Sequence, residues 1–218
     1  MRTKTLLLTA ALAAAGAASA TAQNVYSVNA VGYANVPMVA GFNLVANPFS
    51  TSNDQLDAVL SSPPDQTVVY RFVGGTFLPP YTYYTALPGW DPIDANSSLP
   101  NGEGAFVYSP SAFTATFVGE VPQGAPLHNN FPAGFSIKGS KVPQQATLSV
   151  LGLSAPPDQT VVYQFDPAGQ TYKVPATYYS ALPGWDTDDP NGPIVGIGEG
   201  FWINAPAAAD WTRTFSVN

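Results

Sequence analysis

Hydrophobic and polar residues alternate along much of the chain with the period of a β-strand. Phe42, Leu44 and Ala46 occupy every second position of one segment, and successive side chains of a strand point to opposite faces of its sheet. Residues 67–72 are rich in the β-branched and aromatic side chains that strands favour. Similar patterns predict strands at residues 105–108, 114–118, 201–204 and 212–217. Only residues 55–60 predict helix, for a single turn, so we expect an all-β fold.

Glycine and proline interrupt these patterns every few residues. The chain contains 22 Pro and 19 Gly, which oppose helices and favour turns. Gly74 and Gly75 separate two short strand patterns and predict a two-residue hairpin. Residues 166–169 form a longer turn at the corresponding place before residues 170–172. Hairpins tolerate such changes of loop length, so we expect a hairpin at both places.

The chain contains an internal repeat. The octapeptide Pro-Pro-Asp-Gln-Thr-Val-Val-Tyr at residues 63–70 recurs unchanged at residues 156–163. Two further motifs recur in the same order, namely Ala-Leu-Pro-Gly-Trp-Asp (86–91 and 181–186) and Gly-Glu-Gly (102–104 and 198–200). Repetition of this length indicates an ancestral duplication. We therefore expect two tandem homologous modules, residues 23–121 and 122–218, each a β-sandwich or barrel-like unit of about six short strands.

Residues 1–22 have the features of a secretory signal peptide. Arg2 and Lys4 form a positively charged start, an apolar run too short to span a bilayer follows, and small residues at 20–22 fit a cleavage site. We expect the mature chain to begin at Gln23 and to be exported to the periplasm, the extracellular space or the cell surface. No later segment has the length and apolarity of a transmembrane helix, so membrane insertion is not expected.

The composition is acidic and free of cysteine. The 14 Asp and Glu outnumber the 7 Lys and Arg, of which two would be lost with the signal peptide. Nucleic acids and anionic membranes attract basic patches, so this balance argues against both as partners. The absence of cysteine excludes disulfides and thiolate metal sites. The fold must therefore rest on its hydrophobic core, which 12 Phe, 11 Tyr and 4 Trp can supply.

Two repeated aromatic segments are candidate carbohydrate-binding sites. The candidate residues are Tyr83, Tyr84, Trp90 and Asp91 in the first copy and Tyr178, Tyr179, Trp185 and Asp186 in the second. Their rings would stack on sugar rings, and their carboxylates would bind hydroxyl groups. A Pro-Gly turn before each tryptophan predicts that it lies in or beside a loop. In the alternative interpretation, the tryptophans close the ends of the modules and the tyrosines pack on a sheet face.

The acidic loop after the second tryptophan is a candidate calcium site. Asp186, Asp188, Asp189 and Asn191 offer the oxygen ligands that Ca²⁺ prefers. Their spacing departs from the EF-hand pattern by one residue. In the alternative interpretation, the same side chains form turns in a solvated loop. Calcium is the one cofactor that the sequence suggests, and no cofactor is required.

The sequence gives little support for catalysis. Glu103 and Glu199 each lie between two glycines, and a glycosidase needs its two carboxyl groups within roughly 5–10 Å of each other. We instead expect the glycines to let the backbone come close to a neighbouring segment. His128 is the only histidine, and no nucleophile elbow or phosphate-binding loop is present. We therefore predict a protein that is not an enzyme.

One strand pattern occurs at both ends of the expected mature chain and at the junction of the copies, at residues 26–29, 117–121 and 215–218. If the junction strand serves both modules, the terminal strands have free edges and can pair between molecules, head to tail. If the terminal strands pair within one chain, no such assembly is expected. Self-association and extracellular polysaccharide are therefore the two partners that the sequence suggests.

The modules resemble a group of secreted bacterial tandem β-repeat proteins of uncharacterised function. The resemblance rests on Gly-Phe-Asn-Leu-Val-Ala-Asn-Pro at residues 41–48 and on Gly-Glu-Gly with its following aromatic strand at 102–107 and 198–203. The second copy departs from the first motif at residues 136–140. The resemblance implies export and a β fold, and it transfers no catalytic residues.

Two similar modules favour multivalent contact. We therefore predict a structural or adhesive role at the cell surface or in the periplasm. A carbohydrate-binding module is the main alternative, and a carboxylate-based hydrolase is the weaker one.

Overall fold

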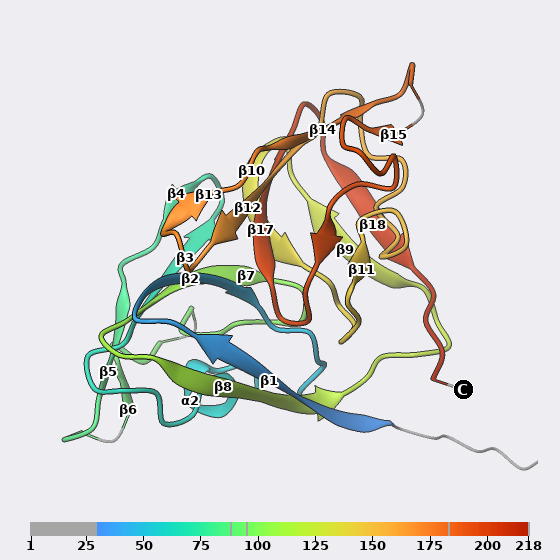
Figure 1. Ribbon diagram of the computed structural model, residues 1–218. Coiled ribbons are helices and arrows are strands. Elements are labelled where there is room, and N and C mark those ends of the chain that lie inside the picture. The colour runs from blue at the N-terminus through green and yellow to red at the C-terminus, as the bar shows by residue number, and fades with distance from the viewer. Residues whose placement is uncertain (1–29, 88, 95, 183, 218) are drawn as a thin grey trace, which may run out of the picture.

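The computed structural model describes residues 30–87, 89–94, 96–182 and 184–217. These residues are nearly all β, and two sheets of six strands each build two similar modules, one above the other in Figure 1. The prediction of an all-β chain with two homologous modules of about six strands is confirmed. The expected signal peptide and the strand pattern at residues 26–29 lie outside the described residues.

The first module combines a six-stranded sheet with a two-stranded ribbon. The sheet has the order β2-β7-β3-β5-β6, with β4 paired to β3 beside this path, and the ribbon joins β1 to β8. Every pairing is antiparallel. The strands are β1 Val31–Met38, β2 Gly41–Ala46, β3 Val68–Val73, β4 Thr76–Phe77, β5 Tyr81–Tyr84, β6 Gly89–Asp91, β7 Gly104–Ser109 and β8 Phe113–Glu120.

The second module repeats this plan. Its sheet has the order β10-β17-β12-β14-β15, with β13 paired to β12, and its ribbon joins β9 to β18. A short additional pair joins β11 to β16. The strands are β9 Leu127–Phe131, β10 Gly134–Gly139, β11 Ala146–Thr147, β12 Val161–Asp166, β13 Thr171–Tyr172, β14 Ala176–Tyr179, β15 Gly184–Trp185, β16 Ile194–Val195, β17 Gly200–Ala205 and β18 Ala209–Arg213.

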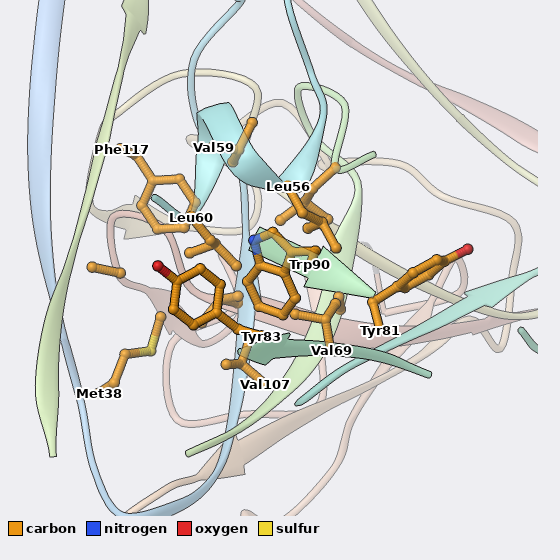
Figure 2. Close-up of a cluster of buried hydrophobic side chains, with 14 of the residues drawn as sticks. Met38, Leu56, Val59, Leu60, Val69, Tyr81, Tyr83, Trp90, Val107 and Phe117 are labelled. Atoms are coloured by element: carbon orange, nitrogen blue, oxygen red, sulfur yellow. The ribbon is translucent and has the colours of Figure 1, made fainter. Parts of the chain in front are cut away.

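Each hydrophobic core lies between a sheet and the ribbon of the same module. In the first module, the sheet contributes Val69, Tyr83 and Trp90, and the ribbon contributes Phe117. Figure 2 shows these side chains gathered beside the short helix α2 (Leu56–Val59). Burial of each large apolar side chain contributes about 1.5–3 kcal/mol. The second module has an equivalent cluster, so each copy of the repeat has a core of its own.

The other face of each sheet packs against the neighbouring module. Phe72 contacts Trp202 with ring centroids 4.8 Å apart, and Phe165 contacts Phe106 at 5.5 Å. Aliphatic side chains of β2 and β10 complete this third buried cluster. In the repeat, Phe72 corresponds to Phe165 and Phe106 corresponds to Trp202. The modules therefore meet about an approximate two-fold axis, as the halves of a symmetric dimer do.

Backbone contacts follow the same approximate symmetry. The N–H of Ala46 donates to the carbonyl of Gly198 at 2.9 Å, and the N–H of Gly139 donates to the carbonyl of Gly102 at 3.0 Å. Ala46 and Gly139 are equivalent positions at the ends of β2 and β10. A Cβ at Gly139 would lie 2.3 Å from the Cβ of Ala46. Only one of these two positions can carry a side chain, because the strand ends meet there.

Several local predictions can be compared with the structure. The helical turn expected at residues 55–60 is present as α2. Both hairpins are present, one around Gly74-Gly75 and one around the longer turn that follows β12. The bounds predicted for the last strand, 212–217, are wrong. The strand is β18, which spans Ala209–Arg213, and Arg213 is its last residue paired with β9. No helix among the described residues is long and apolar enough to cross a membrane.

The described strands nearest the chain ends pair within the molecule. Strand β1 pairs with β8 along its whole length, and β18 pairs with β9. Residue Phe215 then accepts a hydrogen bond from the N–H of Gly124 at 3.0 Å. Head-to-tail association through residues 26–29 stays a prediction.

Candidate functional site

The repeated tryptophans lie in the two cores. Trp90 and Trp185 are each 4% exposed. They face Tyr83 and Tyr178 of the neighbouring strands, with ring centroids 5.5 and 5.7 Å apart. These four rings offer no open face to a sugar, so they form no stacking platform. The tryptophans were predicted to lie in or beside a loop, and each lies in a short strand that begins at the glycine before it.

The other candidates of these segments lie at the surface. Tyr84 and Tyr179 are 36% and 37% exposed, and Asp91 and Asp186 are exposed as well. Tyr84 and Tyr179 end β5 and β14, Asp91 ends β6, and Asp186 follows β15. These strands lie at the end of each sheet opposite β2 and β10. Burial of their tryptophan neighbours leaves these residues without the aromatic platform that the sequence suggested.

Two carboxylates of the acidic loop in the second module accept hydrogen bonds from the chain itself. Asp186 accepts a hydrogen bond from the N–H of Thr177. Asp189 accepts one from the N–H of Asn191 at 2.9 Å and a second from the side-chain amide of that residue. Asp188 is exposed. Within the described residues, no three His, Cys, Asp or Glu side chains are grouped to hold a metal ion.

The two repeated glutamates belong to the contact between the modules. Glu103 forms an ion pair with the buried Lys138 of the second module. Glu199 accepts hydrogen bonds from the side chain of Gln164 at 2.8 Å and from the N–H of Gly196 at 2.7 Å. A Cβ at Gly200 would lie 2.6 Å from the carbonyl oxygen of Val45, which confirms the close backbone approach predicted for the repeated Gly-Glu-Gly motifs.

A groove with an aromatic lining opens beside the module interface. We call it the open groove; its lining comprises Phe72, Phe135, Tyr163, Tyr172 and Trp202. Its volume is about 450 Å³. Phe135 and Tyr172 are 47% and 46% exposed, and the Nε1–H of Trp202 donates to the hydroxyl of Tyr172 at 3.0 Å. The rings therefore combine exposure with fixed orientation.

A second groove lies at the position that the approximate two-fold axis relates to the first. We call it the capped groove; its lining comprises Phe42, Phe106, Phe165 and Gln170. The first three correspond in the repeat to Phe135, Trp202 and Phe72. Its volume is smaller, about 330 Å³. The amide of Gln170 lies over Phe42 and forms hydrogen bonds with both its N–H and its carbonyl, at 2.8 and 2.9 Å.

The two hairpin turns explain why only one groove is capped. The turn between β12 and β13 contains residues 167–170 and reaches across to the first module, where Gln170 meets Phe42. The turn between β3 and β4 contains only Gly74 and Gly75. A Cβ built on either of these glycines meets no atom within 4 Å. The short turn therefore leaves the open groove uncovered.

The chain matches no protein-family model, no curated protein and no solved structure. The resemblance to secreted bacterial β-repeat proteins therefore stays a prediction, and the candidate function rests on the geometry of the two grooves.

The sequence contained a signal for these grooves. Along β3, Val69 points into the core of the first module. Tyr70 and Phe72 lie on the opposite face of the sheet, because successive residues of a strand point to opposite faces. The second copy keeps aromatic residues at the equivalent positions, Tyr163 and Phe165. A strand that is apolar on both faces belongs to a sheet covered on both sides. Reading both faces would have predicted an aromatic contact between the modules.

Proposed function

We propose that this protein is an exported, non-enzymatic adhesive protein that binds neutral polysaccharide in the open groove. The observation that carries the proposal is the exposed aromatic lining, to which both modules contribute. Aromatic side chains of this kind present a rigid apolar surface at low conformational cost, and Tyr and Trp add a polar edge. The C–H faces of pyranose rings are apolar, so they can pack on such a surface.

Charge narrows the class of glycan. The chain has a net charge of −7, and a negative protein repels negative polymers. The five lining residues include no carboxylate, histidine or lysine. These features favour a neutral glycan that is bound and released unchanged. Adhesion fits a site that depends on packing and offers no acid or base.

Affinity electrophoresis tests the proposal. The mature protein would be run through gels that contain one neutral polysaccharide each, taken from a panel of glucans, mannans, galactans and xylans. We expect one or more polysaccharides to retard the wild-type protein. Phe135→Ala removes an exposed ring from the open groove and should weaken binding by about tenfold or more.

Phe42→Ala is the matched control, because Phe42 is the equivalent residue of the capped groove and is similarly exposed, at 39%. It should bind as the wild type does, with unchanged circular dichroism in both variants. Equal retardation of both variants would remove the open groove as the site. No retardation by any polysaccharide would reject the proposed function.

A further inference from the structure

The capped groove contains a bound group that belongs to the chain itself. The Oε1 of Gln170 accepts a hydrogen bond from the N–H of Phe42, and its Nε2 donates to the carbonyl of the same residue. One small planar group thus satisfies the donor and the acceptor of a single strand residue. The pairing is possible because β2 is an edge strand, and edge strands present unpaired N–H and C=O groups.

The equivalent backbone groups of Phe135 point out of the second sheet. In a strand, N–H and C=O groups of every second residue point to the same side. The N–H of Gly139 leaves β10 to reach Gly102, so that of Phe135, four residues earlier, leaves on the same side. The register agrees, because Phe135 is opposite Asn204 in the second sheet as Phe42 is opposite Tyr108 in the first.

No described part of the chain covers this position. At Gly41, beside Phe42, a Cβ would lie 2.7 Å from Oε1 of Gln170. At the equivalent Gly134, beside Phe135, a Cβ would meet no atom within 4 Å. The open groove therefore has the same backbone donor and acceptor as the capped groove, with the space of the cap left empty.

Along β10, Phe135 is the one residue whose outward-facing backbone groups lie open. Ile137 is 1% exposed within the module interface, and the N–H of Gly139 already donates to Gly102. An added peptide strand gains affinity from a series of backbone hydrogen bonds, which this short edge does not supply. A compact ligand with an acceptor and a donor on adjacent atoms therefore fits the backbone of Phe135 better than a peptide strand does.

We infer that the open groove recognises two adjacent hydroxyl groups of a neutral sugar through the backbone of Phe135. One hydroxyl oxygen accepts from the N–H, the neighbouring hydroxyl donates to the carbonyl, and the sugar ring lies against the aromatic lining. The amide of Gln170 makes the same pair of bonds in the capped groove, which is therefore a second site closed by its own hairpin. This inference rests on the proposed function and specifies the chemical groups of the sugar that the groove binds.

Nuclear magnetic resonance on the mature ¹⁵N-labelled protein tests the pairing. The probes are methyl glycosides of glucose, galactose and mannose, each with analogues in which single hydroxyls are removed. In the wild type, the amide signal of Phe135 should shift on titration and that of Phe42 should not. Removal of either paired hydroxyl should weaken binding about five- to tenfold, the value of one hydrogen bond.

Gln170→Ala opens the capped groove and provides the decisive variant. Its amide signals at Phe42 and Phe135 should both shift, with two sites per chain in place of one. Gln145→Ala, at an exposed position outside both grooves, should behave as the wild type. A glycoside that binds without moving the Phe135 signal, or a Gln170→Ala variant with one site, would overturn the inference and leave the proposed function standing.

Two further outcomes are informative. Binding of an uncharged extended tetrapeptide at Phe135, with no glycoside binding there, would replace the sugar with a peptide. Failure of every glycoside and every polysaccharide to bind would overturn both the inference and the proposed function.

Discussion

The open and capped grooves descend from one repeated surface, yet they differ in what a ligand can reach. Both present three aromatic side chains at equivalent positions and one outward-facing backbone pair on an edge strand. The hairpin turns differ, with residues 167–170 in one copy and Gly74-Gly75 in the other, and Tyr163 and Tyr172 line the open groove alone. A two-residue difference in a turn is thus sufficient to cover one site of a duplicated pair. The cores, by contrast, both keep a buried Tyr–Trp pair, Tyr83 with Trp90 and Tyr178 with Trp185, although other core positions differ, such as Ala105 and the equivalent Phe201.

The first way to test this contrast is to remove a core tryptophan from either module. Trp90→Ala and Trp185→Ala should each lower the free energy of unfolding by about 3–5 kcal/mol, because each removes a buried indole. Urea denaturation followed by circular dichroism measures the change. Tyr84→Ala, at an exposed position of the same segment, is the control. If the variants keep their stability and lose only polysaccharide binding, the tryptophans bind sugar directly, as the first interpretation of the sequence proposed.

The second test concerns the approximate two-fold axis. Gly139→Ala places a methyl group 2.3 Å from that of Ala46 and should cost about 1–3 kcal/mol of stability through overpacking. Adding Ala46→Gly in the same chain exchanges the two residues across the axis and should recover at least half of the loss. Thermal unfolding of the two single variants and the double variant measures the coupling. Additive losses would show that the two positions do not meet as described.

The third test converts one groove into the other. Replacing Gly74-Gly75 with the sequence of residues 167–170, Pro-Ala-Gly-Gln, should carry an amide to Phe135 and close the open groove. Polysaccharide binding should weaken by about tenfold or more, because the amide would occupy both the N–H and the carbonyl of Phe135, and each hydrogen bond is worth about 0.5–1.5 kcal/mol. The control is the same insertion with Ala in place of the final Gln, which has the longer loop but lacks the amide. Its binding shows how much of the effect comes from loop length alone. Undiminished binding by the Gln-containing chain would contradict the assigned role of the cap.

The smallest expected effect is a pH dependence in the loop before β12. Hydrogen bonds from the N–H and hydroxyl of Ser180 lower the pKa of Asp158 below its usual value of 3.8. Since the pKa is lower in the folded state, the stabilisation is complete above the unfolded-state pKa near 3.8 and is lost as pH falls through the folded value. Asp158→Asn should reduce the fall in the free energy of unfolding between pH 4 and pH 2, roughly the range of carboxyl titration. Urea denaturation at each pH measures this fall. If the variant loses as much stability as the wild type, Asp158 does not cause the pH dependence.

The repeat and its turns could be read from the sequence because their signals are local. Gly74-Gly75 between two strand patterns predicts a hairpin by itself, and the exact octapeptide repeat predicts two like modules. The glycines around Glu103 and Glu199 likewise pointed to a close backbone contact, which the module interface supplies. Each of these inferences needs only neighbouring residues or a comparison of the two copies.

The site needed information that no local pattern carries. Trp90 was placed near a loop because a three-residue strand is too short to leave a periodic signal, and only its pairing with Tyr83 shows that it is buried. Gln170 has no counterpart in the shorter turn of the first copy, so repetition could not mark it. Its role appears only when residues 128 positions apart in the chain meet at Phe42.

The most direct measurement of the central claim is the accessibility of Trp202 during a titration with the polysaccharide that retards the protein. Trp202 lines the open groove, whereas the other three tryptophans are 3–4% exposed. Acrylamide should therefore quench mainly Trp202, and bound polysaccharide should protect it, with the protection absent in Trp202→Phe. Polysaccharide binding that leaves the quenching of Trp202 unchanged would place the ligand elsewhere and contradict the account of the open groove.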